Sequence, residues 1–237
     1  MCADTLFYLI VYYEKETSML TYEELCQDAD IRTYIDCADQ SLLSLGYTEH
    51  SFAHVTRVSC VAADLLASLG YDKRTVELAK IAGYLHDIGN LVNRVDHSQS
   101  GALIAFRILE HRGMQAEEIA TVVTAIGNHD EGTGVPVNAV AAALILADKS
   151  DVRRTRVRNT DFATFDIHDR VNYSVTSSAL SLNEEKTEVA LSLTIDTEIS
   201  PVMDYFEIFL DRMILCRKAA EKLGLRFCLL VNDQRLF

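Results

Sequence analysis

The pattern of apolar positions predicts that the first two thirds of the chain form a helical bundle. Between residues 21 and 149, apolar side chains recur at the three-to-four-residue spacing of amphipathic helices. The first helix begins at a capping box, in which Thr21 caps the helix and Glu24 reaches back to the cap. A strong helix is predicted over 52–69, and Gly70 ends it.

Further helices of this bundle are bounded by similar signals. Asp72 is the predicted cap of a helix that runs into His86, and Asp96 is the predicted cap of a helix that ends before Gly113. Pro136 is expected to open the most apolar helix, over 137–147. A helix that is apolar on all sides is typical of the centre of a bundle.

The apolar pattern changes after about residue 165. Apolar and polar residues alternate over 171–175 and 189–195, which predicts an antiparallel hairpin with its turn at 183–186. A helix over 201–223 and a last strand over 226–231 follow. We therefore predict a mainly α fold in two parts, which are a helical domain over 20–165 and a small ββαβ module of α+β type over 166–237.

Composition narrows the class of protein. The 237 residues are 49% hydrophobic and 24% charged, which indicates a globular chain. A net charge of −13 argues against nucleic-acid polymers and membranes as partners. Six cysteines without paired spacing favour reduced thiols and a cytoplasmic location.

The apolar run 6–13 is too short to span a bilayer and lacks the features of a signal peptide. It is expected to be a strand or an irregular extension, with Met19 as an alternative start.

Histidines and aspartates stand at the ends and on the faces of these predicted helices. Imidazole and carboxylate groups are ligands of manganese, iron and zinc, and helical bundles build metal sites from side chains of several helices. Each residue alone is more typical of a helix cap or a surface position, but together they predict a metal site. The set is His54, His86, Asp87, His97, His129 and Asp148.

These residues resemble the H…HD…D pattern of the HD-domain superfamily of metal-dependent phosphohydrolases, over about residues 48–155. The segments 97–102 and 128–136 are similar to those of HD-GYP cyclic-dinucleotide phosphodiesterases and other dinuclear HD enzymes. The resemblance implies two divalent metal ions, such as iron or manganese, with Asp87 as their bridge and as the catalytic residue. His54, His86 and Asp148 would be the other ligands of one ion, and His97 and His129 those of the second.

The chain departs from the HD-GYP pattern at three places. Gly134-Val135-Pro136 replaces the GYP tripeptide, Asn128 replaces the first histidine of a usual pair, and Asn90 replaces a lysine. These departures argue against cyclic-di-GMP and leave diadenosine polyphosphates and other nucleotides open. Arg94 and Lys149 adjoin the predicted ligands and are candidates to bind the phosphate of the substrate.

The function implied by this resemblance is hydrolysis of a nucleotide or another small phosphoester by a metal-activated water. Two alternatives stay open, which are a diiron oxygenase of HD type and a regulatory ligand-binding module that has lost hydrolysis. His50 is either a further metal contact or a surface residue, and His111 and His168 belong to no motif. The C-terminal module either pairs across a homodimer or covers one side of the bundle.

Overall fold

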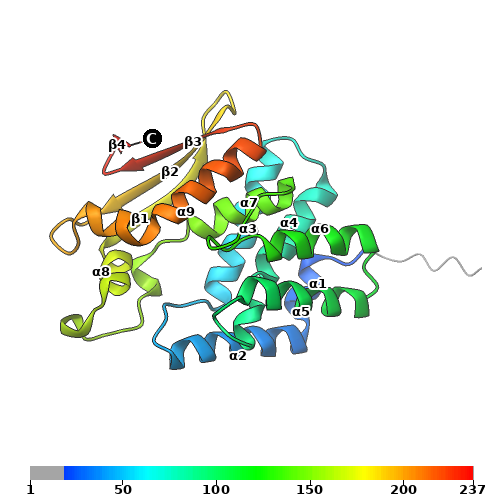
Figure 1. The fold of residues 1–237 in the computed structure, drawn as a ribbon. Helices are drawn as coiled ribbons and strands as arrows, with labels where there is room; N and C mark the ends of the chain where they lie inside the picture. The colour runs from blue at the N-terminus through cyan, green and yellow to red at the C-terminus, as the bar shows by residue number, and fades with distance from the viewer. Residues whose placement is uncertain (1–18, 237) are drawn as a thin grey trace, which may run out of the picture.

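The structure is a computed structural model that describes residues 19–236, so the prediction for residues 6–13 lies outside its described part. Figure 1 shows a helical bundle beside a small sheet, with a long helix between them. The helices of the bundle are α1 (Tyr22–Gln27), α2 (Ala29–Ser44), α3 (Phe52–Ser68), α4 (Lys73–Leu85), the 3-10 helix η1 (Ile88–Leu91), α5 (His97–His111), α6 (Ala116–Gly127) and α7 (Ala139–Lys149).

Helix α7 forms the centre of the molecule. All its residues from Val140 to Ala147 are buried, and it contacts α3, α4, α6 and α9. Removal of so many apolar side chains from water is the main stabilising contribution of a packed core. The prediction that the most apolar helix is central is therefore confirmed.

Two of the predicted helix starts are confirmed, and two differ from the prediction. Thr21 and Glu24 make the predicted capping box, and Asp72 caps α4 through two backbone N–H groups. Asp96 precedes α5, but its side chain makes no capping bond and its backbone is left-handed, with φ of 55°. The apolar helix begins at Ala139 and not after Pro136, because Asn138 accepts a hydrogen bond from the backbone N–H of Ala141.

The C-terminal part has the predicted ββαβ order with one short strand added. Strands β1 and β2 are antiparallel, β2 and β3 are parallel, and β4 pairs with β3, so the sheet order is β1-β2-β3-β4. Helix α9 connects the parallel pair and contacts both the sheet and α7. The bounds are α8 (Ile167–Ser174), β1 (Val175–Leu182), β2 (Glu188–Ile195), α9 (Val202–Lys222), β3 (Arg226–Val231) and β4 (Gln234–Arg235), after the 3-10 turns η2 (Arg154–Arg156) and η3 (Phe162–Thr164).

The predicted strand over 171–175 is wrong, because these residues end helix α8 and only Val175 begins a strand. The side chain of Asp166 accepts a hydrogen bond from the backbone N–H of Asp169 and starts this helix. Val171 and Ser174 are then buried at helical spacing. The division into domains at residue 165 stays a prediction. Over residues 19–236, no helix has the length and apolar character needed to cross a membrane.

Candidate metal centre

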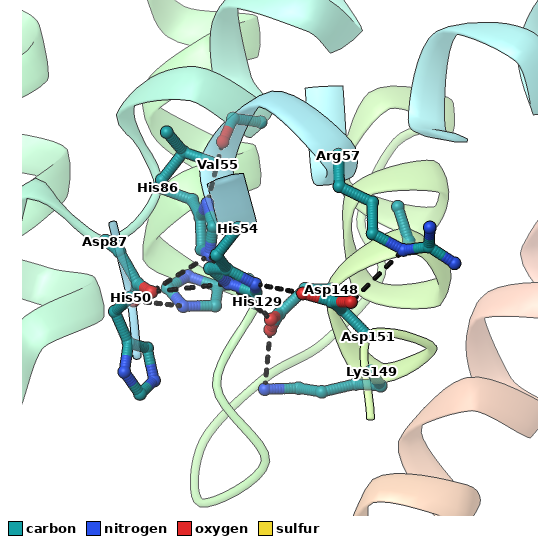
Figure 2. A network of polar contacts seen from close by, with 12 residues as sticks. His50, His54, Val55, Arg57, His86, Asp87, His129, Asp148, Lys149 and Asp151 are labelled. Carbon is teal, nitrogen blue, oxygen red and sulfur yellow. Dashed lines mark hydrogen bonds and ion pairs between the residues drawn. The ribbon is translucent and has the colours of Figure 1, made fainter. Parts of the chain in front are cut away.

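The six predicted ligands come together in the middle of the bundle, and Figure 2 labels all of them except His97, which contacts Asp87 and His129. His54 lies on α3, His86 and Asp87 follow α4, His97 begins α5, His129 follows α6, and Asp148 lies in the last turn of α7. All are buried except Asp148, whose side chain is 12% exposed. Ligands that are distant in sequence are thus brought together by the ends of five helices.

The turn after Asp87 allows α5 to approach closely. A Cβ atom on Gly89 would collide with the carbonyl oxygen of His97 and would lie 2.5 Å from the backbone nitrogen of Gly101. Only glycine fits between these two backbones. The contact between η1 and α5 places His97 beside Asp87.

Asp87 lies between two pairs of histidines. Its Oδ2 is 3.5 Å from Nε2 of His54 and 3.3 Å from Nε2 of His86. Its Oδ1 is 3.4 Å from Nε2 of His97 and 4.0 Å from Nε2 of His129. The two Nε2 atoms are 3.3 Å apart in the first pair and 3.2 Å apart in the second. One carboxylate therefore faces both pairs, one with each oxygen.

Asp148 joins the first pair only. Its Oδ1 is 3.4 Å from Nε2 of His54 and 3.8 Å from Nε2 of His86. Its Oδ2 is 2.8 Å from Nζ of Lys149, which also lies 2.6 Å from Oε2 of Glu131. We call His54, His86, Asp148 and Asp87 Oδ2 the first half-site, and His97, His129 and Asp87 Oδ1 the second half-site.

The ring nitrogens fit a divalent cation. The Nδ1 atoms of the four histidines contact oxygen acceptors, which are Asp151 Oδ2 at 2.8 Å and the carbonyl oxygens of Gly83 at 2.8 Å, Arg94 at 3.1 Å and Ile126 at 2.7 Å. A carbonyl or carboxylate oxygen can only accept, so Nδ1 carries the proton and the Nε2 lone pair points into the cluster. Facing lone pairs and carboxylates repel each other, and a bound cation removes that repulsion. His54, His86 and Asp148, and likewise His86, Asp87 and His129, lie close enough to share an ion.

The electrostatics of the cluster also favour a cation. Burial raises the pKa of Asp87, but His86 and His54 outweigh it and hold that pKa well below its usual range. Burial and the neighbouring His86 and His97 lower the pKa of His129. Burial and Arg156 lower the pKa of His54, but bonds to Asp148, Asp151 and Asp87 raise it to about 9. The carboxylates around His54 therefore favour a positive charge at this position.

Asp151 is a residue of the site that sequence reasoning missed. It is buried, and its carboxylate accepts from Nδ1 of His54 and pairs with Arg57 at 3.1 Å and Arg153 at 2.5 Å (Figure 2). An ion pair with Arg154, three residues further on, is the ordinary expectation for Asp151, but the guanidinium of Arg154 donates to the carbonyl oxygen of Tyr173. The sequence did contain a signal for Asp151. It lies three residues after Asp148, and this spacing places the two carboxylates near the same end of α7.

The predicted phosphate-binding residues have different surroundings. Nη1 of Arg94 donates to Oδ1 of Asn90 at 3.3 Å, and Nδ2 of Asn90 donates to Oδ1 of Asp87 at 3.1 Å. Arg94 also lines a pocket of about 410 Å³ beside the metal centre. Lys149 is buried, and its Nζ forms ion pairs with Oδ2 of Asp148 at 2.8 Å and Oε2 of Glu131 at 2.6 Å. Phosphate binding by either residue stays a prediction.

The remaining histidines lie outside the two half-sites. His50 contacts the carbonyl oxygen of Thr48 through Nδ1 at 2.7 Å and lines the same pocket as Arg94. Its ring centroid is 5.5 Å from that of His54. His168 is exposed and lines the pocket from α8, and His111 is exposed at the end of α5.

The bundle and its cluster of histidines and aspartates form a helical domain with side chains that could hold a metal ion. The family model of the HD domain matches residues 51–158, which contain all six predicted ligands. This segment, a little under half of the chain, therefore resembles the HD domain. HD-family proteins bind divalent metals, and the buried cluster can hold such an ion.

Two curated proteins resemble part of the chain. An uncharacterized protein of Methanocaldococcus jannaschii is 26% identical over 161 residues, which are 59% of this chain and 62% of that protein. Ribonuclease Y 1 of Pediococcus pentosaceus is 35% identical over 107 residues, which are 44% of this chain and 18% of that protein. The chain thus spans less than two thirds of the length of either relative.

Among solved structures, a predicted HD superfamily hydrolase from an uncultured Thermotogales bacterium is 25% identical to this chain. The match has a TM-score of 0.42 and covers 55% of this chain and 73% of that one.

Proposed function

We propose that the protein is a phosphohydrolase that binds two divalent metal ions, such as iron or manganese, and hydrolyses a nucleotide or another small phosphoester. The observation that carries this proposal is the position of Asp87, which presents one carboxylate oxygen to each pair of histidines. A carboxylate with this placement can bridge two ions. The protonated Nδ1 atoms support the same assignment, because they leave all four Nε2 atoms free to coordinate.

The chemistry follows from what the residues hold in place. Two divalent ions, when bound, supply a water of lowered pKa and stabilise charge on a phosphoryl oxygen. Asn90 fixes Oδ1 of Asp87 and thereby the bridge. Arg94 reaches from the second half-site into the pocket, where its guanidinium can bind two phosphate oxygens at once. Lys149 pairs with Asp148 and is the other candidate to contact the phosphate.

The size and charge of the molecule favour a small substrate. The pocket of about 410 Å³ falls within the usual range of small-molecule sites. A net charge of −13 opposes the approach of an RNA polymer. The word ribonuclease in the name of the Pediococcus relative denotes cleavage of a phosphodiester, which supports phosphoester chemistry at the shared domain.

The test combines metal analysis with a substrate screen. The purified protein is analysed for metals, loaded with iron or manganese, and incubated without oxygen with a panel of nucleotides, sugar phosphates and phosphodiesters. We expect release of phosphate or of a phosphomonoester that stops when a chelator is added. Metal occupancy without turnover of any phosphoester would contradict the proposal, and so would a reaction that requires oxygen.

A further inference from the structure

The pocket beside the metal centre has walls from two parts of the chain. Tyr47, His50, Arg94 and Arg156 come from the bundle and the turn after it, and Arg94 also touches the second half-site. His168 and Asn172 of α8 and Phe209 and Arg212 of α9 complete the opposite part of the lining. These last four residues lie outside the segment 51–158 that matches the HD domain.

Three arginines of this pocket are held in fixed orientations. Arg94 donates to Asn90, and its guanidinium lies 5.7 Å from the ring centre of Tyr47. Arg156 donates to the carbonyl oxygens of Glu49 and Asp151, each at 2.8 Å. These contacts limit the rotation of the guanidinium groups before a ligand arrives, so less entropy is lost when an anion binds.

Arg212 is also held in place, by an acidic side chain and an aromatic ring. Its Nε donates to Oε1 of Glu131 at 2.7 Å, and its guanidinium lies 4.3 Å from the ring centre of Phe209. Phe209 is itself buried. Both contacts leave the two Nη groups available on the side of the pocket. Glu131 also pairs with Lys149, so Arg212 stands at the end of a chain of charges that leads to Asp148.

Three arginines and two aspartates line the pocket, and two of the arginines also pair with carboxylates outside the lining, Arg156 with Asp151 at 3.9 Å and Arg212 with Glu131 at 2.7 Å. The two aspartates are Asp166 and Asp169, and each accepts a hydrogen bond, from the backbone of Asp169 and from Asn159 respectively. The three guanidinium groups outnumber these two carboxylates in a chain whose net charge is −13. Of the three arginines, Arg94 is the one whose guanidinium contacts a predicted metal ligand, His97 at 3.5 Å, so we do not assign Arg212 to the phosphate at the metal centre.

We propose that Arg212, from outside the HD domain, binds a second anionic group of the substrate. The pocket then selects phosphoesters that carry a further phosphate or carboxylate group. This inference rests on the proposed function, because it assigns the reacting phosphate to the metal centre. It also gives the C-terminal module a role, which is to supply the residue that determines specificity.

The test measures binding and needs no turnover. The metal-loaded protein is titrated with three probes, which are propylphosphonate, propylene bisphosphonate and phosphonopropionate. We expect the bisphosphonate to bind more tightly than propylphosphonate. In Arg212→Ala that advantage falls by about tenfold to a hundredfold, as expected for one lost charge-assisted contact, while propylphosphonate binds as before. Arg217→Ala, an exposed arginine of the same helix, should bind all three probes like the native protein.

The outcomes separate this inference from the proposed function. Phosphonopropionate that binds as tightly as the bisphosphonate supports the proposal with a carboxylate as the second group, and weaker binding supports a second phosphate. Equal affinity for propylphosphonate and the bisphosphonate in the native protein would overturn the inference but not phosphate binding at the metals. Equal loss for all probes in Arg212→Ala, together with lower metal content, would also overturn it, because Arg212 would then act through Glu131 and Lys149. Arg212→Lys keeps the charge beside Glu131 and should keep native metal content, with only part of the bisphosphonate affinity.

Discussion

The two half-sites share Asp87 but differ in what surrounds them. In the first, Asp148 joins two histidines, and the carboxylate of Asp151 accepts the Nδ1 proton of His54. In the second, two histidines have only backbone carbonyl oxygens behind them. An additional ligand and a carboxylate behind an imidazole both strengthen metal binding. We therefore expect the first half-site to hold its ion more tightly, and the second to exchange its ion more readily beside the pocket.

The largest effect is expected where the half-sites meet. Asp87→Asn keeps the shape of the side chain but removes the negative charge and one oxygen that faces the histidines. Both metal ions should be lost, and hydrolysis should fall to the level of chelator-treated native protein. Elemental analysis and phosphate release measure the two effects, and Asp36→Asn on the exposed face of α2 is the control. Full metal content in Asp87→Asn would contradict the assignment of the bridge.

The next change removes one half-site and spares the other. The native protein should hold about two ions per chain, and the double variant His97→Ala/His129→Ala about one. Metal titration followed by elemental analysis measures this difference. His111→Ala removes an exposed histidine of α5 and should leave the content unchanged. A native sample that saturates at one ion would show that the second half-site does not bind metal.

A third substitution makes the half-sites more alike. Asp151→Asn weakens the acceptor behind His54, so the affinity of the first half-site should fall by about tenfold to a hundredfold. Competition with a chromogenic chelator measures this affinity. Arg57→Gln removes another partner of Asp151 but leaves its bond to His54 in place, and it serves as the control. Equal losses in both variants would mean that Asp151 acts by stabilising the fold.

The residues of the candidate metal centre could be selected from the sequence, but what orients them could not. The apolar periodicity predicts the helices on which the site residues lie. The order of His54, His86, Asp87 and Asp148 follows the H…HD…D pattern. The groups that fix the ring nitrogens are mostly backbone carbonyl oxygens, which every residue possesses and no motif marks. The carboxylate of Asp151 is visible in the sequence, but an ion pair with Arg154 would explain it without any role in the metal centre.

The C-terminal part shows a second limit. The strands over 189–195 and 226–231 were predicted because several alternating residues fix their period. Residues 171–175 are too few to separate period two from a helical turn, and the cap at Asp166 decides in favour of α8. The approach of Arg212 to the pocket depends on how α9 packs against α7, more than fifty residues earlier in the chain. Local patterns carry no information about that packing.

The smallest effect is expected at Arg94, which adjoins the second half-site without belonging to it. Its backbone carbonyl oxygen accepts the Nδ1 proton of His97, while its guanidinium faces the pocket. Arg94→Ala keeps the carbonyl and removes only the guanidinium, so metal content should stay native. The loss of one charge-assisted contact to phosphate should lower kcat/KM by about tenfold. Arg107→Ala removes an exposed arginine of α5 that pairs only with Glu110 among the described residues, and it should leave kcat/KM unchanged. Native kcat/KM in Arg94→Ala would contradict phosphate binding by Arg94 and leave Lys149, which contacts Asp148, as the other candidate. A loss of metal in the same variant would instead show that the side chain, and not only the carbonyl, holds His97 in place.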